Sequence, residues 1–170
     1  MTSPLENGNR WAVLGAAVFV MTCVGLIVEQ VPAIALVNES PSLPKGLYVR
    51  QPGGRPDRSA IVAVLQPPSV RQYLASLGMP TDVLLIKRVA AVGGEVVCRR
   101  DGTITTPDRV VQAVMRDRRG VVLPAWEGCR RLAPGELFLL GDTASSFDSR
   151  YFGAVRRDQV QGVYRTGLTW

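Results

Sequence analysis

The sequence contains no histidine among its 170 residues. This absence excludes a Ser-His-Asp triad and a zinc site built on histidine ligands. Lysine is nearly absent as well, because only Lys45 and Lys87 among the 20 Lys and Arg residues are lysines. Arginine stays protonated in proteins, whereas a buried lysine can lose its proton. A serine nucleophile in this chain would therefore use a lysine as its general base.

The distribution of charge argues against a nucleic acid partner. The net charge is +6 at pH 7, and a basic surface can bind nucleic acid. The arginines, however, are scattered between Arg50 and Arg165, and they form no dense run interleaved with aromatic residues that could stack on bases. The chain also has neither histidine nor a C-x-x-C motif for a metal site. We expect no nucleic acid partner, no metal and no organic cofactor.

One long apolar run lies near the N-terminus. Trp11 to Val28 carries no charge and is bracketed by Arg10 and Glu29, and this length is just enough to span a bilayer as a helix. We expect a short tail over residues 1–10, a transmembrane anchor over 11–28, and one domain over 29–170. The alternatives are a buried helix and a signal peptide cleaved at the small-x-small pattern Ala33-Ile34-Ala35.

The cysteines favour export of the domain. Arg10 precedes the apolar run and many more basic residues follow it, but a segment of about 140 residues can be translocated regardless of its charge. Cys23 lies inside the apolar run, which leaves Cys98 and Cys129 as an even pair in the polar part of the chain. Such a pair can form a disulfide in an oxidising compartment. The alternative is two unrelated buried thiols.

The region after the apolar run has the pattern of an antiparallel, mainly β domain, with short apolar stretches separated by Pro and Gly turn signals. Val70–Leu77 and Asp108–Arg116 look helical instead, and Arg100–Arg131 reads as an insertion or an edge excursion. The expected strands are Gly46–Arg50, Ala60–Leu65, Val83–Val92, Glu95–Arg99, Val121–Leu123, Glu136–Leu140 and Gly162–Tyr164.

Lys87 is the better candidate for a general base. As a strand, Val83–Val92 places Lys87 as the one ionisable group on an otherwise apolar face, with Arg88 on the opposite face. Burial lowers the pKa of a lysine because it penalises the charged form. The alternation does not say which face is inside, and the alternative is a lysine whose amine reaches solvent. Lys45 lies among polar and turn residues, and we expect it to be solvated.

Two serines in the stretch Asn38–Tyr48 are candidates for the nucleophile and its neighbour. The adjacent prolines, Pro41 and Pro44, restrict the backbone around them. In an extended chain Ser40 and Ser42 project to the same side. One could attack a carbonyl while the other donates a hydrogen bond to the developing oxyanion. The alternative is a proline-rich linker with solvated serines.

A third stretch, Gly141–Gly153, follows the expected strand Glu136–Leu140 and concentrates hydroxyl side chains with Asp148 and Arg150. A hydroxyl in this loop could orient the lysine amine and help to keep it neutral. The alternative is an ordinary polar loop with a surface ion pair, which contributes little to stability.

Together the three stretches resemble the type I signal peptidase family, and they are closest to its conjugative-transfer branch, the TraF-type peptidases. The Lys-Arg box of that family matches Lys87-Arg88, and its last box matches Gly141-Asp142 and Ser146–Gly153. Order and spacing agree over nearly the whole chain. The first motif of the branch, Asn-x-Ser/Thr-x-Ser-x-Pro-x-Gly-x-Tyr, is matched by Asn38, Ser40, Ser42, Pro44, Gly46 and Tyr48.

The resemblance implies a fold and a set of roles. It implies a signal-peptidase-like catalytic β domain in which Ser42 is the nucleophile and Lys87 the general base. Ser40 would donate to the oxyanion and Ser146 would orient the lysine. The remaining implied residues are Leu43 and Ile86, lining a pocket for a small substrate side chain, and Asp148 and Arg150, bracing the site.

The sequence is therefore interpreted as a membrane-anchored serine endopeptidase with a Ser42/Lys87 dyad. The resemblance implies an exported precursor protein as its substrate, such as a conjugative pilin, which that branch can also cyclise. The expected location is the inner (cytoplasmic) membrane, with the lipid bilayer as a partner of the single span and the catalytic domain in the periplasm. Two alternatives are a self-cleaving repressor-type peptidase and a non-catalytic anchored β scaffold of a secretion or conjugation apparatus.

Overall fold

The computed structural model describes residues 11–22 and 33–170. Residues 11–22 form a helix with exposed apolar side chains, and residues 34–170 form a separate compact body. Among the described residues, no helix combines the length and the apolar character that crossing a bilayer requires. The expected tail, residues 1–10, and the second part of the expected anchor, including Cys23, lie outside the described residues. The anchor stays a prediction.

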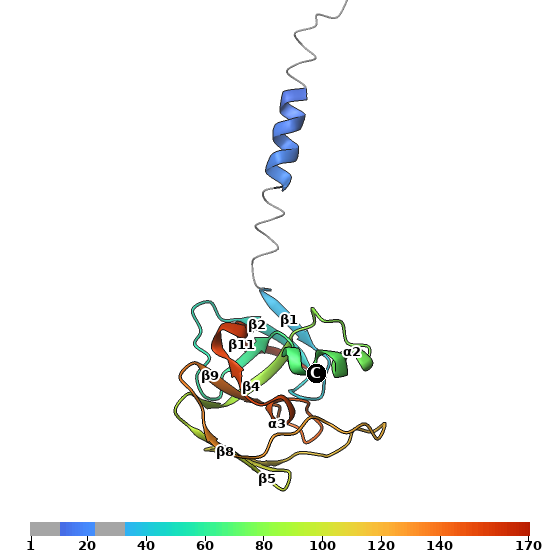
Figure 1. Ribbon diagram of the computed structural model, residues 1–170. Coiled ribbons are helices and arrows are strands. Elements are labelled where there is room, and N and C mark those ends of the chain that lie inside the picture. Colours follow the sequence, from blue (N-terminus) through green and yellow to red (C-terminus); the bar gives the residue numbers. More distant parts are fainter. Residues whose placement is uncertain (1–10, 23–32) are drawn as a thin grey trace, which may run out of the picture. The chain divides into compact units, whose positions relative to one another are not determined.

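Within the described body the strands form two antiparallel sheets, as the pattern of short apolar stretches predicted (Figure 1). The larger sheet consists, in spatial order, of β1 (Ala35–Asn38), β2 (Gly46–Arg50), β11 (Val160–Thr169), β3 (Ile61–Val64), β4 (Leu85–Val92), β9 (Glu136–Leu140) and β10 (Val155–Arg156). The smaller sheet consists of β7 (Val110–Gln112), β6 (Thr103–Thr105), β5 (Val96–Arg100) and β8 (Gly128–Arg131). The short helices of the body are η1 (Pro68–Val70), α2 (Arg71–Ser76), α3 (Ser149–Phe152) and η2 (Arg157–Gln159).

Apart from Lys87 and Arg88, strand β4 is apolar on both faces, because both faces are covered. Leu85 and Val89 belong to a core shared with β3, β9 and α2, while Ala91 packs in a second core with residues of the smaller sheet. Ile86 belongs to a third core, which lies around Tyr48 of β2. A near-continuous apolar run is typical of such a fully buried strand. For this reason alternation alone did not identify one inner face for Lys87.

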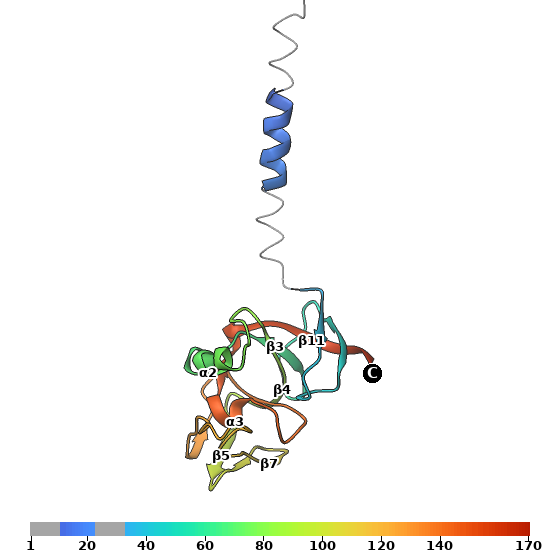
Figure 2. The same cartoon turned by 90° about the vertical axis from the view of Figure 1, so that its right-hand side faces the viewer.

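Two of the elements expected between residues 100 and 131 are wrong. Asp108–Arg116 is not helical, because β7 occupies Val110–Gln112 and pairs with β6. Its burial alternates, with Val111 packed inward between two exposed neighbours, which is a strand period. Val121–Leu123 forms only an isolated bridge, Arg116 to Val122. Arg100–Arg131 supplies the outer strands of the smaller sheet, and Figures 1 and 2 both place β5 at the opposite end of the body from β11.

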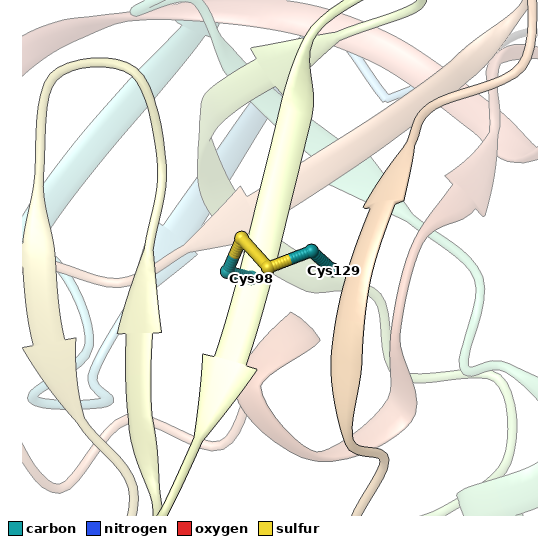
Figure 3. Close-up of a disulfide and its surroundings, with 2 residues drawn as sticks. All are labelled: Cys98 and Cys129. Carbon is teal, nitrogen blue, oxygen red and sulfur yellow. A yellow bond between two sulfur atoms is a disulfide. The ribbon is translucent and has the colours of Figure 1, made fainter.

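Cys98 and Cys129 form a disulfide between neighbouring strands of the smaller sheet (Figure 3). The two residues face each other directly in the register of β5 and β8. They are separated by 31 positions in the chain. The bond therefore attaches the exposed strand β8 to the sheet by a covalent link as well as by backbone pairing.

We expect the double variant Cys98→Ser/Cys129→Ser to lose about 3–4 kcal/mol of unfolding free energy, because the disulfide restricts a loop of this length in the unfolded chain. Urea denaturation under oxidising conditions measures the loss. The same measurement in dithiothreitol is the control, since reduction should lower the stability of the wild type and leave the double variant unchanged. Equal stability of the two proteins under oxidising conditions would contradict the expectation.

Candidate active site

Residues 39–45 form a turn between β1 and β2, which pair so that Asn38 faces Gly46. Gly46, the first residue of β2 after this turn, pairs with β11, where it has a φ of 155° and a side chain would overlap the Leu168 carbonyl. Ser42 lies within this turn and is 5% exposed. The proline-rich linker with a solvated serine is therefore wrong for Ser42.

Lys87 extends from β4 to the turn. Its Nζ lies 2.8 Å from Ser42 Oγ, and its residue is only 4% exposed. The alternative of a solvent-reaching lysine is thus wrong for Lys87. Lys45, as expected, is exposed, and its amine lies 3.9 Å from a carboxylate oxygen of Glu39.

Burial lowers the pKa of the Lys87 ammonium to about 8. The loss of hydration is the largest cause, the Asp148 carboxylate opposes it by raising the pKa, and the Arg150 guanidinium adds to the lowering. A fraction of Lys87 is consequently neutral near pH 7. A neutral amine at 2.8 Å can accept the Ser42 hydroxyl proton.

Ser40 lies on the outer side of the same turn. Its Oγ is 2.7 Å from Ser42 Oγ, so the two serines meet as expected. The reason differs from the expectation, because the chain bends through a turn here and is not extended. The side chain of Asn38 holds this bend, since it bonds backbone groups of Ser40, Leu43 and Pro44.

The loop after β9 packs against the turn. The backbone N–H of Asp142 donates to the Ser42 carbonyl at 2.6 Å, and the Asp142 carboxylate forms an ion pair with Arg88 at 3.0 Å. Gly141 passes close by, where a side chain would overlap Ser146 and the Ser42 carbonyl. Arg88 and Asp142 therefore link β4, the loop after β9 and the turn that contains Ser42.

Asp148 and Arg150 form a buried ion pair with an N–O distance of 2.7 Å. Their side chains are 0% and 1% exposed, so the alternative of a surface ion pair is wrong. Asp148 also accepts from the Gly141 N–H at 2.8 Å. Arg150 donates to the carbonyls of Thr143 and Ala144. The pair thus fixes both ends of the loop that lies against Ser42.

The other residues implied by the resemblance are buried nearby. Ser146 Oγ finds no hydrogen-bond partner in the described part of the chain, so the expected bond to Lys87 is not formed. The reason is its position, because it packs beside the Gly141 backbone. Leu43 and Ile86 pack in one core with Tyr48. The orienting role of Ser146 and the substrate pocket both stay predictions.

Sequence reasoning assigned no role to Asn38, Arg88 or Asp142. A signal for Asn38 was available, since asparagine often bonds the backbone two residues further on and so initiates a turn. Its Oδ1 accepts from the Ser40 N–H in this way. No local signal connects Arg88 with Asp142, which are 54 positions apart in the chain.

Comparison with known proteins gives consistent results. Residues 9–169 match the family described as signal peptidase, peptidase S26. Two plasmid transfer proteins TraF from Escherichia coli are 31% and 28% identical over 150 residues, covering 80% of this chain and 84% and 83% of theirs. A conjugal transfer protein TraF from Agrobacterium fabrum is 32% identical over 145 residues, covering 79% of this chain and 82% of its own. A signal peptidase I structure from Enterococcus faecalis V583 shares 27% identity at a TM-score of 0.38, covering 65% of this chain and 97% of its own.

Proposed function

The chain belongs to the S26 family of signal peptidases, and on this premise we propose that it is a serine endopeptidase with Ser42 as nucleophile and Lys87 as general base. The observation that carries the proposal is the hydrogen bond of 2.8 Å between Lys87 Nζ and Ser42 Oγ at a buried position. In a chain without histidine, a buried amine within hydrogen-bond distance is the chemically suitable base.

The proposed reaction begins when the neutral amine of Lys87 takes the proton of Ser42 as Oγ attacks the scissile carbonyl carbon. The carbonyl oxygen gains the negative charge and is stabilised by the Ser40 hydroxyl and the Ser42 backbone N–H. Lys87 then gives its proton to the leaving amine, the peptide bond breaks, and an ester on Ser42 remains. A water molecule or an amine attacks this ester with Lys87 again as base, which releases the acyl group and restores the Ser42 hydroxyl.

We extend the proposal to the substrate and the location. Relatives named as plasmid and conjugal transfer proteins support an exported precursor of a conjugation system, such as a pilin, which would be cleaved after small residues. Attack by an amine instead of water would cyclise the product. The apolar run Trp11–Val28 supports an anchor in the inner membrane. The disulfide supports a periplasmic domain, because disulfides persist in oxidising compartments.

The non-catalytic scaffold remains the second candidate. It requires that Ser42 and Lys87 lie apart and that Lys87 is solvated, which disagrees with their contact and burial. The repressor-type peptidase requires a DNA-binding helical segment, whereas the helix of residues 11–22 is apolar and uncharged.

Co-expression with a candidate pilin precursor tests the proposed function. We expect the wild type and Lys45→Arg to produce the shortened pilin, because the Lys45 side chain is exposed and its amine faces Glu39. Ser42→Ala should leave only the precursor, since no nucleophile remains. Mass spectrometry of the pilin distinguishes cleavage from cyclisation, because the cyclic product is one water lighter than the linear cleaved product. Processing by Ser42→Ala at the wild-type level would overturn the assignment of the nucleophile.

A further inference from the structure

Asn38 is the last residue of β1 and is 3% exposed, although it carries a polar side chain. Its amide nitrogen lies 3.0 Å from the carbonyls of Ser40 and Leu43 and 3.1 Å from that of Pro44. Its Oδ1 lies 2.8 Å from Ser40 Oγ and 3.2 Å from the Ser40 backbone nitrogen. Both ends of the amide are thus occupied by the turn that contains Ser42.

These partners determine the orientation of the amide. Carbonyl oxygens accept and cannot donate, so the group facing three of them must be the NH2 group. The group facing Ser40 is then the amide oxygen, which only accepts. Ser40 must therefore donate its single hydroxyl proton to Asn38 in the resting site.

This direction matters because Ser40 Oγ is also 2.7 Å from Ser42 Oγ. A hydroxyl that donated to Ser42 would occupy a lone pair of the nucleophile and weaken its attack. While its hydroxyl donates to Asn38, Ser40 can only accept a hydrogen bond from Ser42. The lone pairs of Ser42 then stay available for the substrate carbonyl, and its proton stays available for Lys87 once that amine is neutral.

We propose that Asn38 is a positioning residue that keeps the proton of the Ser40 hydroxyl directed away from the nucleophile and available for the oxyanion. When charge develops on the substrate oxygen, the Ser40 proton turns about the Cβ–Oγ bond from Asn38 to that oxygen. Asn38 Oδ1 keeps the Ser40 N–H, so the serine itself stays in place. This inference rests on the proposed function of Ser42 and Lys87.

The bracing of the turn and the positioning of Ser40 are separable. The bracing is shared, because the Tyr48 hydroxyl also donates to the Pro44 carbonyl, at 2.7 Å. The contact with the Ser40 hydroxyl is made by Oδ1. If Asn38 acts through the Ser40 hydroxyl, substitution of Asn38 should have little effect once that hydroxyl is absent. If Asn38 acts only by bracing the turn, its substitution should cost the same with or without the hydroxyl.

A double-mutant cycle uses this difference. We expect Ser40→Ala to lower kcat by about 10²–10³-fold, as loss of one oxyanion donor does elsewhere. Asn38→Ala should lower kcat by about ten- to a hundredfold through misplacement of that donor, with little change in KM. In the Ser40→Ala background, Asn38→Ala should cost less than about a further twofold. Glu39→Ala, an exposed change in the same turn, is the matched control and should retain kcat.

The outcomes separate this inference from the proposed function. A wild type without peptidase activity would overturn both. An active wild type in which Asn38→Ala costs the same factor in both backgrounds overturns the role of Asn38 alone. Circular dichroism and thermal melting monitor the fold of each variant. Should Asn38→Ala not fold, Asn38→Ser, which is too short to bond Ser40 and the Leu43 carbonyl together, replaces it in the same cycle.

Discussion

Lys87→Met should abolish peptidase activity and at the same time make the folded domain more stable. As the proposed base, Lys87 is the group that removes the Ser42 proton across a distance of 2.8 Å. A methionine of similar volume cannot accept a proton, and loss of a general base costs about 10²–10⁴-fold in rate. Lys87→Arg should be as inactive, because a guanidinium does not lose its proton. Cleavage of a fluorogenic precursor peptide, reported as kcat/KM, measures both losses.

The gain in stability follows from the lowered pKa of Lys87. Its value falls from 10.5 in the unfolded chain to about 8 in the folded state, a difference that corresponds to about 3 kcal/mol. The unfolded chain binds the proton more tightly, so the charged lysine opposes folding below pH 8. This penalty decreases as the pH rises from 8 and is nearly gone above 10.5. Lys87→Met should therefore gain up to about 3 kcal/mol at pH 7 and progressively less at higher pH.

Urea denaturation at pH values from 6 to 11 tests the gain. Lys45→Met is the matched control, because Lys45 is the other lysine of the chain and its side chain is half exposed. Its stability should follow that of the wild type at every pH. The pH dependence of the wild-type kcat/KM should show the same group, with a rise that levels off above about pH 8. A Lys87→Met protein no more stable than the wild type at pH 7 would contradict the assigned burial.

Arg150→Met should destabilise the domain by about 3–5 kcal/mol, because it leaves the Asp148 carboxylate buried without its counter-charge. It also removes the hydrogen bonds that Arg150 donates to the Thr143 and Ala144 carbonyls. These carbonyls belong to the loop that bonds the Ser42 backbone through Asp142. Activity should consequently fall together with stability. Urea denaturation and the peptidase assay on the same preparations measure the two effects.

The chain offers a close control for this variant. Arg156 and Asp158 form an ion pair with the same N–O distance, 2.7 Å, and the same separation of two positions. Their side chains are mostly exposed, so Arg156→Met should cost less than about 1 kcal/mol. The comparison holds residue type, spacing and distance constant and varies burial. Similar losses for Arg150→Met and Arg156→Met would show that burial of the first pair does not matter to stability.

Elements bounded by turn residues were the most predictable parts of the fold. The limits of β2 and β9 agree with the sequence, because each lies next to Gly or Pro signals and contains several apolar residues. Strand β8 was missed because its four residues are all exposed and three of them are polar or Gly. Pairing with β5 and the disulfide hold it, and neither leaves a local pattern.

The residues of the candidate site also differ in whether the sequence predicted them. Ser42 and Lys87 were predicted because a chain without histidine restricts the choice of base and because their motifs are local. The ion pair of Arg88 with Asp142 was not predicted, since it depends on the register that places β4 beside β9. The orientation of Ser146 was not predicted either, because it follows from close packing on Gly141.

The position of β11 has a consequence for the nascent chain. This strand comes after every other strand in sequence, yet it lies between β2, next to the serine turn, and β3, the neighbour of the lysine strand. A ribosome-bound chain that has not yet extruded residues 160–169 lacks the strand that joins the two halves of the dyad. We therefore expect Ser42 and Lys87 to come together only late in biosynthesis, after residues 160–169 have been made.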